Sequence, residues 1–251
     1  MRTLFIGDIV GPVGVDFTVK ILPGLIREEA IDFVIANGEN TADHNGITKA
    51  IAQDLRFAGV DVITLGNHAF RQKSGCSLMG ECEYLIRPGN FPSQAPGQGY
   101  TIVETPFGRV GVVNAMGQLY MISCDNPFSF VLRALEKLAG CDYIFVDFHA
   151  EATSEKLAMG HFLDGKITCL FGTHTHVQTN DFRLLPKGSG YVSDAGMVGG
   201  RDSILGIQKD GPISRFVTGI PALFVPDEEN LLFQSLIFDT ETKEIFPKNI
   251  G

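Results

Sequence analysis

Short apolar segments rich in β-forming residues recur along the chain, and each is followed closely by Gly, Asn, Asp or His. Such segments are typical of buried strands, while the longer stretches between them have helical patterning. Alternation of strand and helix implies parallel β-α-β units, so we expect an α/β protein with layered sheets. The predicted strands are residues 3–6, 33–36, 62–65, 143–148 and 167–171.

Four helices are predicted between these strands. We expect Pro23 to kink or break the first helix, because proline removes an internal helix hydrogen bond. The predicted helices are residues 15–30, 47–58, 129–138 and 154–163.

Two other regions have the pattern of antiparallel strands. A Pro-Phe-Gly turn between two apolar segments predicts a hairpin, and polar turns near the C-terminus predict a further meander. Between the two sheet-forming halves, residues 72–97 predict an irregular excursion. The hairpin strands are residues 100–105 and 109–114, and the later strands are 222–225, 231–238 and 244–246.

The composition is that of an ordinary globular protein, with 44% hydrophobic residues in a chain of 251. No linker or repeat divides the chain, so a single domain covering residues 1–251 is predicted. Twenty basic residues against 29 acidic ones give a net charge of −9. Because the sequence has no run of basic residues that would bind a nucleic-acid phosphate backbone, we expect no stable nucleic-acid complex. A small phosphate substrate at a local cationic site remains compatible with this charge.

A cytoplasmic location is predicted. The apolar runs are far shorter than the ~20 residues that span a bilayer, so no membrane association is expected. The N-terminus has no pattern of a cleaved signal. Five cysteines, an odd number with no C-x-x-C pair, indicate reduced thiols. Nothing in the sequence indicates an oligomeric state.

Eight residues at the ends of the predicted strands are of types that bind metals or carry protons. The carboxyl ends of parallel strands share one edge of a sheet, so these residues should converge there. Carboxylate, amide and imidazole groups together suit a pair of divalent ions about 3.5–4 Å apart, which predicts a dinuclear hydrolase. The residues are Asp8, Glu39, Asn40, Asn67, His68, His149, His174 and His176.

Each of these residues also has a purely structural interpretation. Asp8 could cap a helix or form a turn, and residues 37–40 resemble a turn. His149 directly follows an apolar strand, where a buried imidazole needs a partner. His174 and His176 point to the same side if their segment is extended. The joint occurrence of these residues, always after strands, favours the metal site.

The ordered set resembles the calcineurin-like metallophosphoesterases, whose blocks are D-x-H, G-D, G-N-H-[DE], a lone H and G-H-x-H. Here Asp8 has no histidine two residues later, Glu39 followed by Asn40 replaces the bridging aspartate, and the last block is Gly-Thr-His-Thr-His. These replacements resemble the YmdB-type branch, described as cyclic-nucleotide phosphodiesterases. Similar blocks cover nearly the whole chain, at residues 36–42, 147–156, 172–179, 191–197 and 203–206.

The resemblance implies a four-layer α/β/β/α sandwich, and it assigns the ligands. It implies that Glu39 bridges two divalent ions, most consistent with iron or manganese, with zinc also suitable. His68 matches the family's proton donor to the leaving group. One ion would take Asp8, Glu39, Asn40 and His176, and the other Glu39, Asn67, His149 and His174.

The expected function is hydrolysis of small cyclic nucleotides by a metal-bridging hydroxide, with His68 as proton donor. The alternatives are a phosphatase or RNA nuclease using the same site, or a regulatory metal-binding protein with incidental turnover. Other polar residues near the motifs are expected elsewhere than among the ligands. His44 and His161 are not placed there, Asp194 is left open, and a surface role is favoured for Arg71, Lys156, Arg183 and Arg201.

Overall fold

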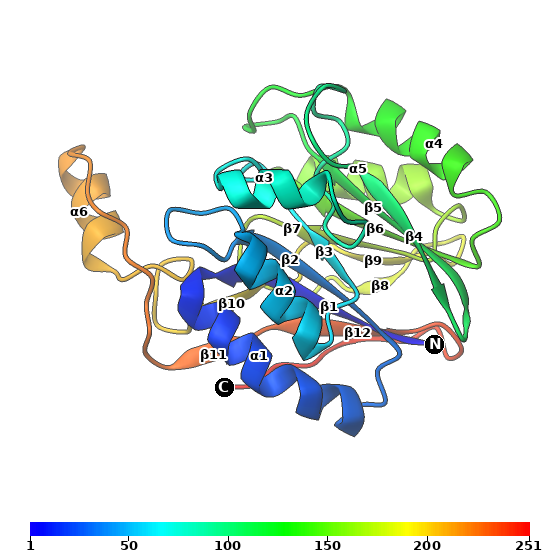
Figure 1. The fold of residues 1–251 in the computed structure, drawn as a ribbon, viewed down its shortest axis with the longest axis horizontal. Helices are drawn as coiled ribbons and strands as arrows, with labels where there is room; N and C mark the ends of the chain where they lie inside the picture. Colours follow the sequence, from blue (N-terminus) through cyan, green and yellow to red (C-terminus); the bar gives the residue numbers. More distant parts are fainter.

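Two β-sheets lie face to face in the computed structural model, which describes residues 1–251, and helices cover their outer faces (Figure 1). The first sheet contains β1 (Arg2–Val10), β2 (Phe33–Asn40), β3 (Val62–Thr64), β10 (Met197–Gly200), β11 (Leu231–Phe233), β12 (Ser235–Asp239) and β13 (Ile245–Pro247). The second sheet contains β4 (Tyr100–Thr105), β5 (Gly108–Met116), β6 (Tyr143–His149), β7 (Cys169–Thr173), β8 (Arg183–Leu184) and β9 (Gly190–Val192).

Strand β1 organises the first sheet. One edge pairs in parallel with β2, which pairs in parallel with β3. The other edge is divided, since residues 2–6 pair with antiparallel β12 and residues 8–9 with parallel β10. In the second sheet β5, β6, β7 and β9 are parallel, and β4 forms the predicted hairpin with β5. The parallel strands thus bring their carboxyl ends to one edge of each sheet.

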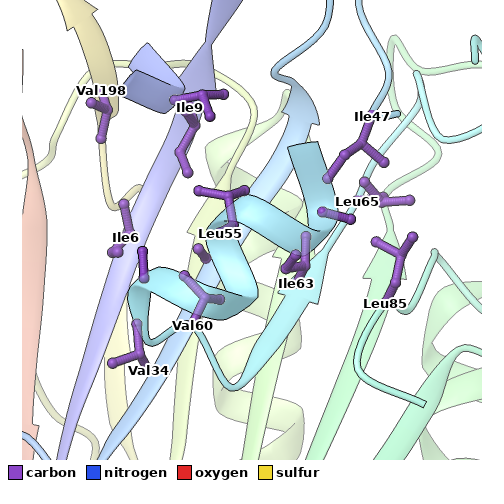
Figure 2. Close-up of a cluster of buried hydrophobic side chains, with 14 of the residues drawn as sticks. Ile6, Ile9, Val34, Ile47, Leu55, Val60, Ile63, Leu65, Leu85 and Val198 are labelled. Carbon is purple, nitrogen blue, oxygen red and sulfur yellow. The ribbon is translucent and has the colours of Figure 1, made fainter. Parts of the chain in front are cut away.

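Alternating side chains divide the core into three layers. Phe5 points between the sheets, where its ring stacks on Phe171 with centroids 4.5 Å apart. Its neighbour Ile6 points outward and belongs to the cluster beneath α2 (Lys49–Ala58), which Figure 2 shows around Leu55. Val146 in turn belongs to the cluster on the outer face of the second sheet. The predicted α/β/β/α sandwich is confirmed.

The helices follow the predicted ones closely. Helices α1 (Gly11–Glu28), α2 and α3 (Lys73–Met79) pack on the first sheet. Helices α4 (Pro127–Lys137) and α5 (Thr153–Leu163) pack on the second sheet. Helix α6 (Asp210–Thr218) projects from the body of the protein (Figure 1). Of the predicted kink or break at Pro23, the break is not found, because α1 continues through this residue. No helix combines the length and apolarity needed to cross a bilayer. All five cysteines are free.

The C-terminal third differs most from prediction. The apolar run 222–225 is not a strand, and the run 231–238 is divided at Gln234 into β11 and β12, which pair with different neighbours. Strands β8, β9 and β10 and helix α6 were not predicted, and neither was α3, which lies within the segment 72–97 that was expected to be irregular. The run 222–225 was misinterpreted because its side chains lie at the surface, with Leu223 73% exposed, so its apolarity reflects no burial in a sheet.

Candidate metal centre

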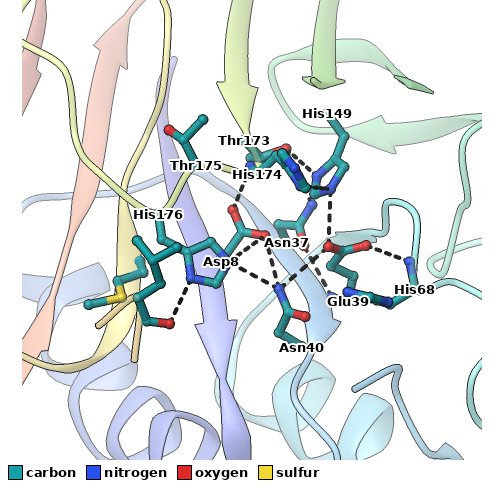
Figure 3. Close-up of polar contacts among 12 residues, drawn as sticks. Asp8, Asn37, Glu39, Asn40, His68, His149, Thr173, His174, Thr175 and His176 are labelled. Carbon is teal, nitrogen blue, oxygen red and sulfur yellow. Dashed lines mark hydrogen bonds and ion pairs between the residues drawn. The ribbon is translucent and has the colours of Figure 1, made fainter. Parts of the chain in front are cut away.

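The eight predicted site residues converge where the two sheets meet (Figure 3). Their contacts cross large separations in sequence, such as the 3.0 Å bond from the His174 backbone N–H to Asp8 Oδ2 and the 2.9 Å bond from the His68 N–H to Glu39 Oε2. In the first sheet, Asp8 lies in β1, Glu39 and Asn40 lie in β2, and Asn67 and His68 lie in the turn after β3. In the second sheet, His149 lies in β6, and His174 and His176 lie in the loop after β7.

Several of these residues lie inside strands rather than after them. Asp8 is within β1, Glu39 and Asn40 end β2, and His149 is the last residue of β6. The sequence predicted earlier strand ends, because it could not show that backbone pairing continues past the apolar runs. The β1–β2 register shifts twice around Asp8, and such irregularities re-aim side chains near functional sites.

Close packing at the site requires glycine at position 66. A Cβ added at Gly66 would overlap the His149 ring and the Glu39 carboxylate. Any side chain there would therefore displace two of the converging groups.

The imidazole of His149 is at the centre of the cluster and is fully buried. Its Nδ1 lies 2.9 Å from Thr173 Oγ1, and the Thr173 hydroxyl donates to Asp147 Oδ1 at 2.7 Å. Because that hydroxyl uses its only proton on Asp147, it must accept from His149 Nδ1–H. The Nε2 atom of neutral His149 is then left with a lone pair.

Three further electron-pair donors face this nitrogen. Glu39 Oε1 and Asn67 Oδ1 each lie 3.0 Å from His149 Nε2, and His174 Nδ1 lies 3.1 Å away. His174 directs its other nitrogen, Nε2, to Glu151 Oε2 at 3.1 Å, which leaves its Nδ1 as a lone pair as well. Such atoms repel one another unless a proton or a metal cation lies among them. Glu39, His149 and His174 form a group that could hold a metal ion.

A second group lies on the other side of Glu39. Asn40 Nδ2 is 3.4 Å from Asp8 Oδ1 and 3.2 Å from His176 Nε2, and Asp8 Oδ1 and His176 Nε2 are 3.6 Å apart. The His176 Nδ1–H donates to the Leu205 carbonyl at 3.0 Å, so its Nε2 lone pair faces Asp8. A half-turn of the Asn40 amide would present Oδ1 in place of Nδ2. These donors also fit a divalent ion.

The pKa values reflect how closely these charges are held together. Burial alone disfavours charge on His149, but the adjacent Glu39 carboxylate raises the histidine pKa to about 9. Glu39 is buried too, yet its pKa falls to about 2 because His149 is beside it. Burial and His149 lower the pKa of His174 to about 3. In the protein alone, a proton on His149 thus supplies the positive charge that the carboxylate requires.

The loop of His174 and His176 is not extended, so the reason given for their shared orientation is wrong. Their φ angles are 100° and 62°, in the left-handed region. Asp194 holds the loop by accepting from the N–H and the hydroxyl of Thr175, at 3.0 and 2.7 Å. The Lys156 ammonium lies 2.8 Å from the same carboxylate oxygen.

The surface role favoured for Lys156 is also wrong, since the residue is 1% exposed. Its position on α5 puts its long side chain beneath the loop. Asp194, left open by the sequence, is the loop's main anchor. Arg183 and Arg201 are exposed and line no part of the site's pocket.

His68 lies at the rim of the cluster. The Asn67 amide lies 3.2 Å from His68 Nε2 and can only donate there, which leaves the proton on Nδ1. That Nδ1 atom is buried and has no hydrogen-bond partner. Burial lowers the pKa of His68. An unpartnered ring nitrogen beside a metal-binding group is a candidate for proton exchange with a bound ligand.

A pocket of about 880 Å³ opens over the site. One side presents Glu39, His68 and His174, while Arg71 and His44 add positive or titratable groups near the rim. Arg71, for which a surface role was favoured, is therefore both exposed and part of the pocket, and the same holds for His44. Residues 204–226 line another part of the pocket, which is apolar apart from Arg215.

Comparison with known proteins agrees with this arrangement. The model of the YmdB-like protein family matches residues 4–250. The chain belongs to the YmdB-like family. A relative in Bacillus subtilis (strain 168), named 2',3'-cyclic-nucleotide 2'-phosphodiesterase, is 42% identical over 245 residues, covering 96% of this chain and 92% of the relative.

Solved structures of similar proteins share the fold of this YmdB-like chain. The crystal structure of a hypothetical protein from Thermus thermophilus is 40% identical, with a TM-score of 0.94 over 100% of this chain and 99% of the other. One from Mycoplasma pneumoniae, described as a novel phosphatase, is 33% identical, with a TM-score of 0.90 over 100% and 92% of the two chains.

Sequence reasoning missed the residues that support the cluster in this YmdB-like chain. Asp147 and Thr173 orient His149, Glu151 orients His174, and Lys156 with Asp194 holds the loop. One signal was available: Asp147 interrupts an otherwise apolar strand, and a buried carboxylate there needs a donor. Burial raises its pKa to about 6.

Proposed function

We propose that this chain is a phosphodiesterase that uses two divalent ions and acts on small cyclic nucleotides. The prediction of a phosphoester-hydrolysing enzyme is confirmed by its curated relatives, which are named phosphodiesterase or phosphatase/phosphodiesterase. The number of ions, the substrate and the residue roles are our inference. The supporting observation is the convergence of Glu39, Asn67 and His174 atoms of metal-binding type on His149 Nε2.

In this proposal each ion has its own ligand group, and Glu39 serves both. Mixed oxygen and nitrogen ligation without thiolate suits iron or manganese, and also zinc, so the ligand types alone do not select the metal. Such ions lower the pKa of a coordinated water and offset negative charge on phosphoryl oxygens. One ion would be held by Glu39, Asn67, His149 and His174, and the other by Asp8, Glu39, Asn40 and His176.

The chain's own residues position the substrate and move a proton. His68, whose side chain lines the pocket, supplies the proton to the departing alkoxide. Arg71, at the pocket rim, is suited to bind a phosphate oxygen. Thr173 and Glu151 bind one ring nitrogen each of His149 and His174. The other nitrogen of each ring is thereby directed at the site, where it would bind a metal ion.

The cyclic-nucleotide substrate is supported by two observations. The B. subtilis relative is named for 2',3'-cyclic nucleotides. The pocket has room for a mononucleotide, since ligand sites of roughly 300–1,000 Å³ are usual. The net charge of −9 disfavours a long nucleic-acid substrate.

The test is a rate comparison among 2',3'-cyclic AMP, 3',5'-cyclic AMP, a phosphopeptide and single-stranded RNA, after removal of metal and reloading with manganese or iron. We expect turnover only with metal, and fastest with the 2',3'-cyclic nucleotide. Faster cleavage of RNA or the phosphopeptide would favour the nuclease or phosphatase alternative. Metal binding without turnover of any of the four would favour the regulatory one.

A further inference from the structure

The segment between β10 and β11, residues 201–230, carries α6 away from the sheets (Figure 1); we call it the arm. Its two legs are joined at the base by backbone bonds of 2.8 Å from Gln208 N to Val225 O and from Asp227 N to Gly206 O. Beyond these bonds α6 buries only Pro212. The helix is therefore held at its base and packs on little else in its own chain.

The exposed side of α6 is apolar. Ile213, Phe216 and Val217 have the spacing i, i+3, i+4, which places them on one face of α6, and Ile220 follows directly after the helix C-cap Gly219. Phe216 is 84%, Val217 78% and Ile220 64% exposed. Isolated helices shorter than roughly 12–15 residues are marginal in water, and α6 has nine. Something outside this chain must cover the face to stabilise it.

The size of the apolar surface suits a protein interface. Together its residues expose roughly 900 Å², close to the ~800 Å² that each partner contributes to a standard stable complex. Patches of this size are rare on monomers. The exposed apolar residues of the arm are Leu205, Ile213, Phe216, Val217, Ile220, Leu223, Phe224 and Val225.

The charge of the arm favours a second copy over a membrane. Between residues 203 and 226 the only charged residues are Lys209, Asp210 and Arg215, and the five other charged residues of the arm lie at its two ends, so two apolar faces can meet without strong like-charge repulsion. A helix that binds a lipid surface carries many basic residues on its polar face, and α6 has only Arg215. The chain's net charge of −9 would also be repelled by anionic lipid.

We propose that the apolar face of the arm is the interface between two copies of this chain, related by a two-fold axis. Such an isologous contact uses the same patch on both partners, as a self-complementary apolar helix face permits. Pairing supplies α6 with the packing that its own chain lacks.

The pairing also bears on the site. Arg215, Phe216, Leu223 and Phe224 of the arm form a wall of the same pocket as the metal-binding residues. An arm held by its partner gives this wall a fixed position, whereas an unpaired arm leaves it free to move. This consequence for substrate binding rests on the proposed function, but the dimer itself does not.

The decisive variant is Val217→Glu with Ile220→Glu, because both residues are exposed and neither lines the pocket. The matched control is Phe57→Glu on α2, which is 88% exposed and distant from the arm in sequence and fold. We expect light scattering to give the wild type and the control a mass of twice 27.3 kDa, and the double variant a mass of 27.3 kDa. Far-UV circular dichroism checks folding, and Val217→Glu alone provides a milder change.

A wild-type protein that stays monomeric overturns the proposal. Binding of the monomer to phosphatidylglycerol vesicles, without dimerisation, overturns it in the same way. So does a folded double variant that keeps the dimer mass, or a Phe57→Glu chain that dissociates as the double variant does. With the cyclic-nucleotide assay, the double variant should have a raised KM and unchanged metal content. Mass needs no substrate, so failure of the assay and failure of the dimer are distinguishable.

Discussion

The cluster around His149 and the arm that carries α6 border the same pocket, but they differ in how they are stabilised. The cluster is buried, and almost every polar atom has a partner on another strand or loop. The arm is exposed, and α6 contributes only Pro212 to the interior. The difference indicates that the reacting side of the pocket is fixed within one chain, while the outer wall depends on what the arm binds.

Glu39→Gln should have the largest effect. It removes the charge that faces His149 and weakens the acceptor of the His68 backbone N–H. We expect kcat/KM to fall by about 10³-fold or more, with loss of bound metal, because metal-assisted hydrolysis depends on that charge. Elemental analysis and steady-state rates measure both. Glu136→Gln, exposed on α4, is the control, and wild-type activity in Glu39→Gln would remove this residue from the site.

His68→Ala should separate proton transfer from metal binding. We expect the rate to fall by about 10²–10⁴-fold, the usual contribution of a general acid, while metal content is unchanged. His161→Ala, an exposed histidine on α5, should leave both unchanged. If metal content and rate fall together in His68→Ala, its separate role as donor is wrong.

Lys156→Met should destabilise the cluster side of the pocket. Removing one partner of a buried ion pair costs about 3–5 kcal/mol, because Asp194 is left charged and buried. Urea unfolding of the metal-free protein measures this loss. Lys137→Met, exposed on α4, provides the comparison. Equal unfolding free energies in the two variants would mean that the Lys156 pair does not hold the loop.

Val217→Glu should have the smallest effect on stability within one chain. Surface substitutions away from packed features usually change the unfolding free energy by less than about 0.5 kcal/mol. Unfolding at protein concentrations low enough to keep the chain monomeric isolates this contribution. A loss of several kcal/mol there would show that α6 packs against its own chain.

The sequence predicts the cluster better than the arm for a physical reason. Strands such as β2 and β6 are apolar because they are buried, so the strands could be located to within a few residues, together with the proposed ligands Glu39 and His149. The arm is apolar where it is exposed, and the same reasoning wrongly turned residues 222–225 into a strand. An apolar segment is expected to be buried, but the sequence does not show whether it is buried within its own chain or against a partner.

The supporting contacts were largely beyond prediction, although Asp147 within an apolar strand was one available signal. Thr173 reaches His149, and Lys156 reaches Asp194, only because β6, β7 and α5 lie side by side in the fold. No spacing in the sequence encodes these pairs. The proposed ligands could be recognised because carboxylate, amide and imidazole side chains follow the predicted strands. The residues that position them have no such pattern in the sequence, and only the tertiary structure shows their contacts.

The central claim is that the lone pairs around His149 Nε2 surround a cation site. A crystal structure of the manganese-loaded protein, with anomalous diffraction data, tests it most directly. We predict an anomalous peak in contact with Glu39, His149 and His174, and a second beside Asp8 and His176. Ordered side chains in the same positions, with no peak among them, would contradict the account.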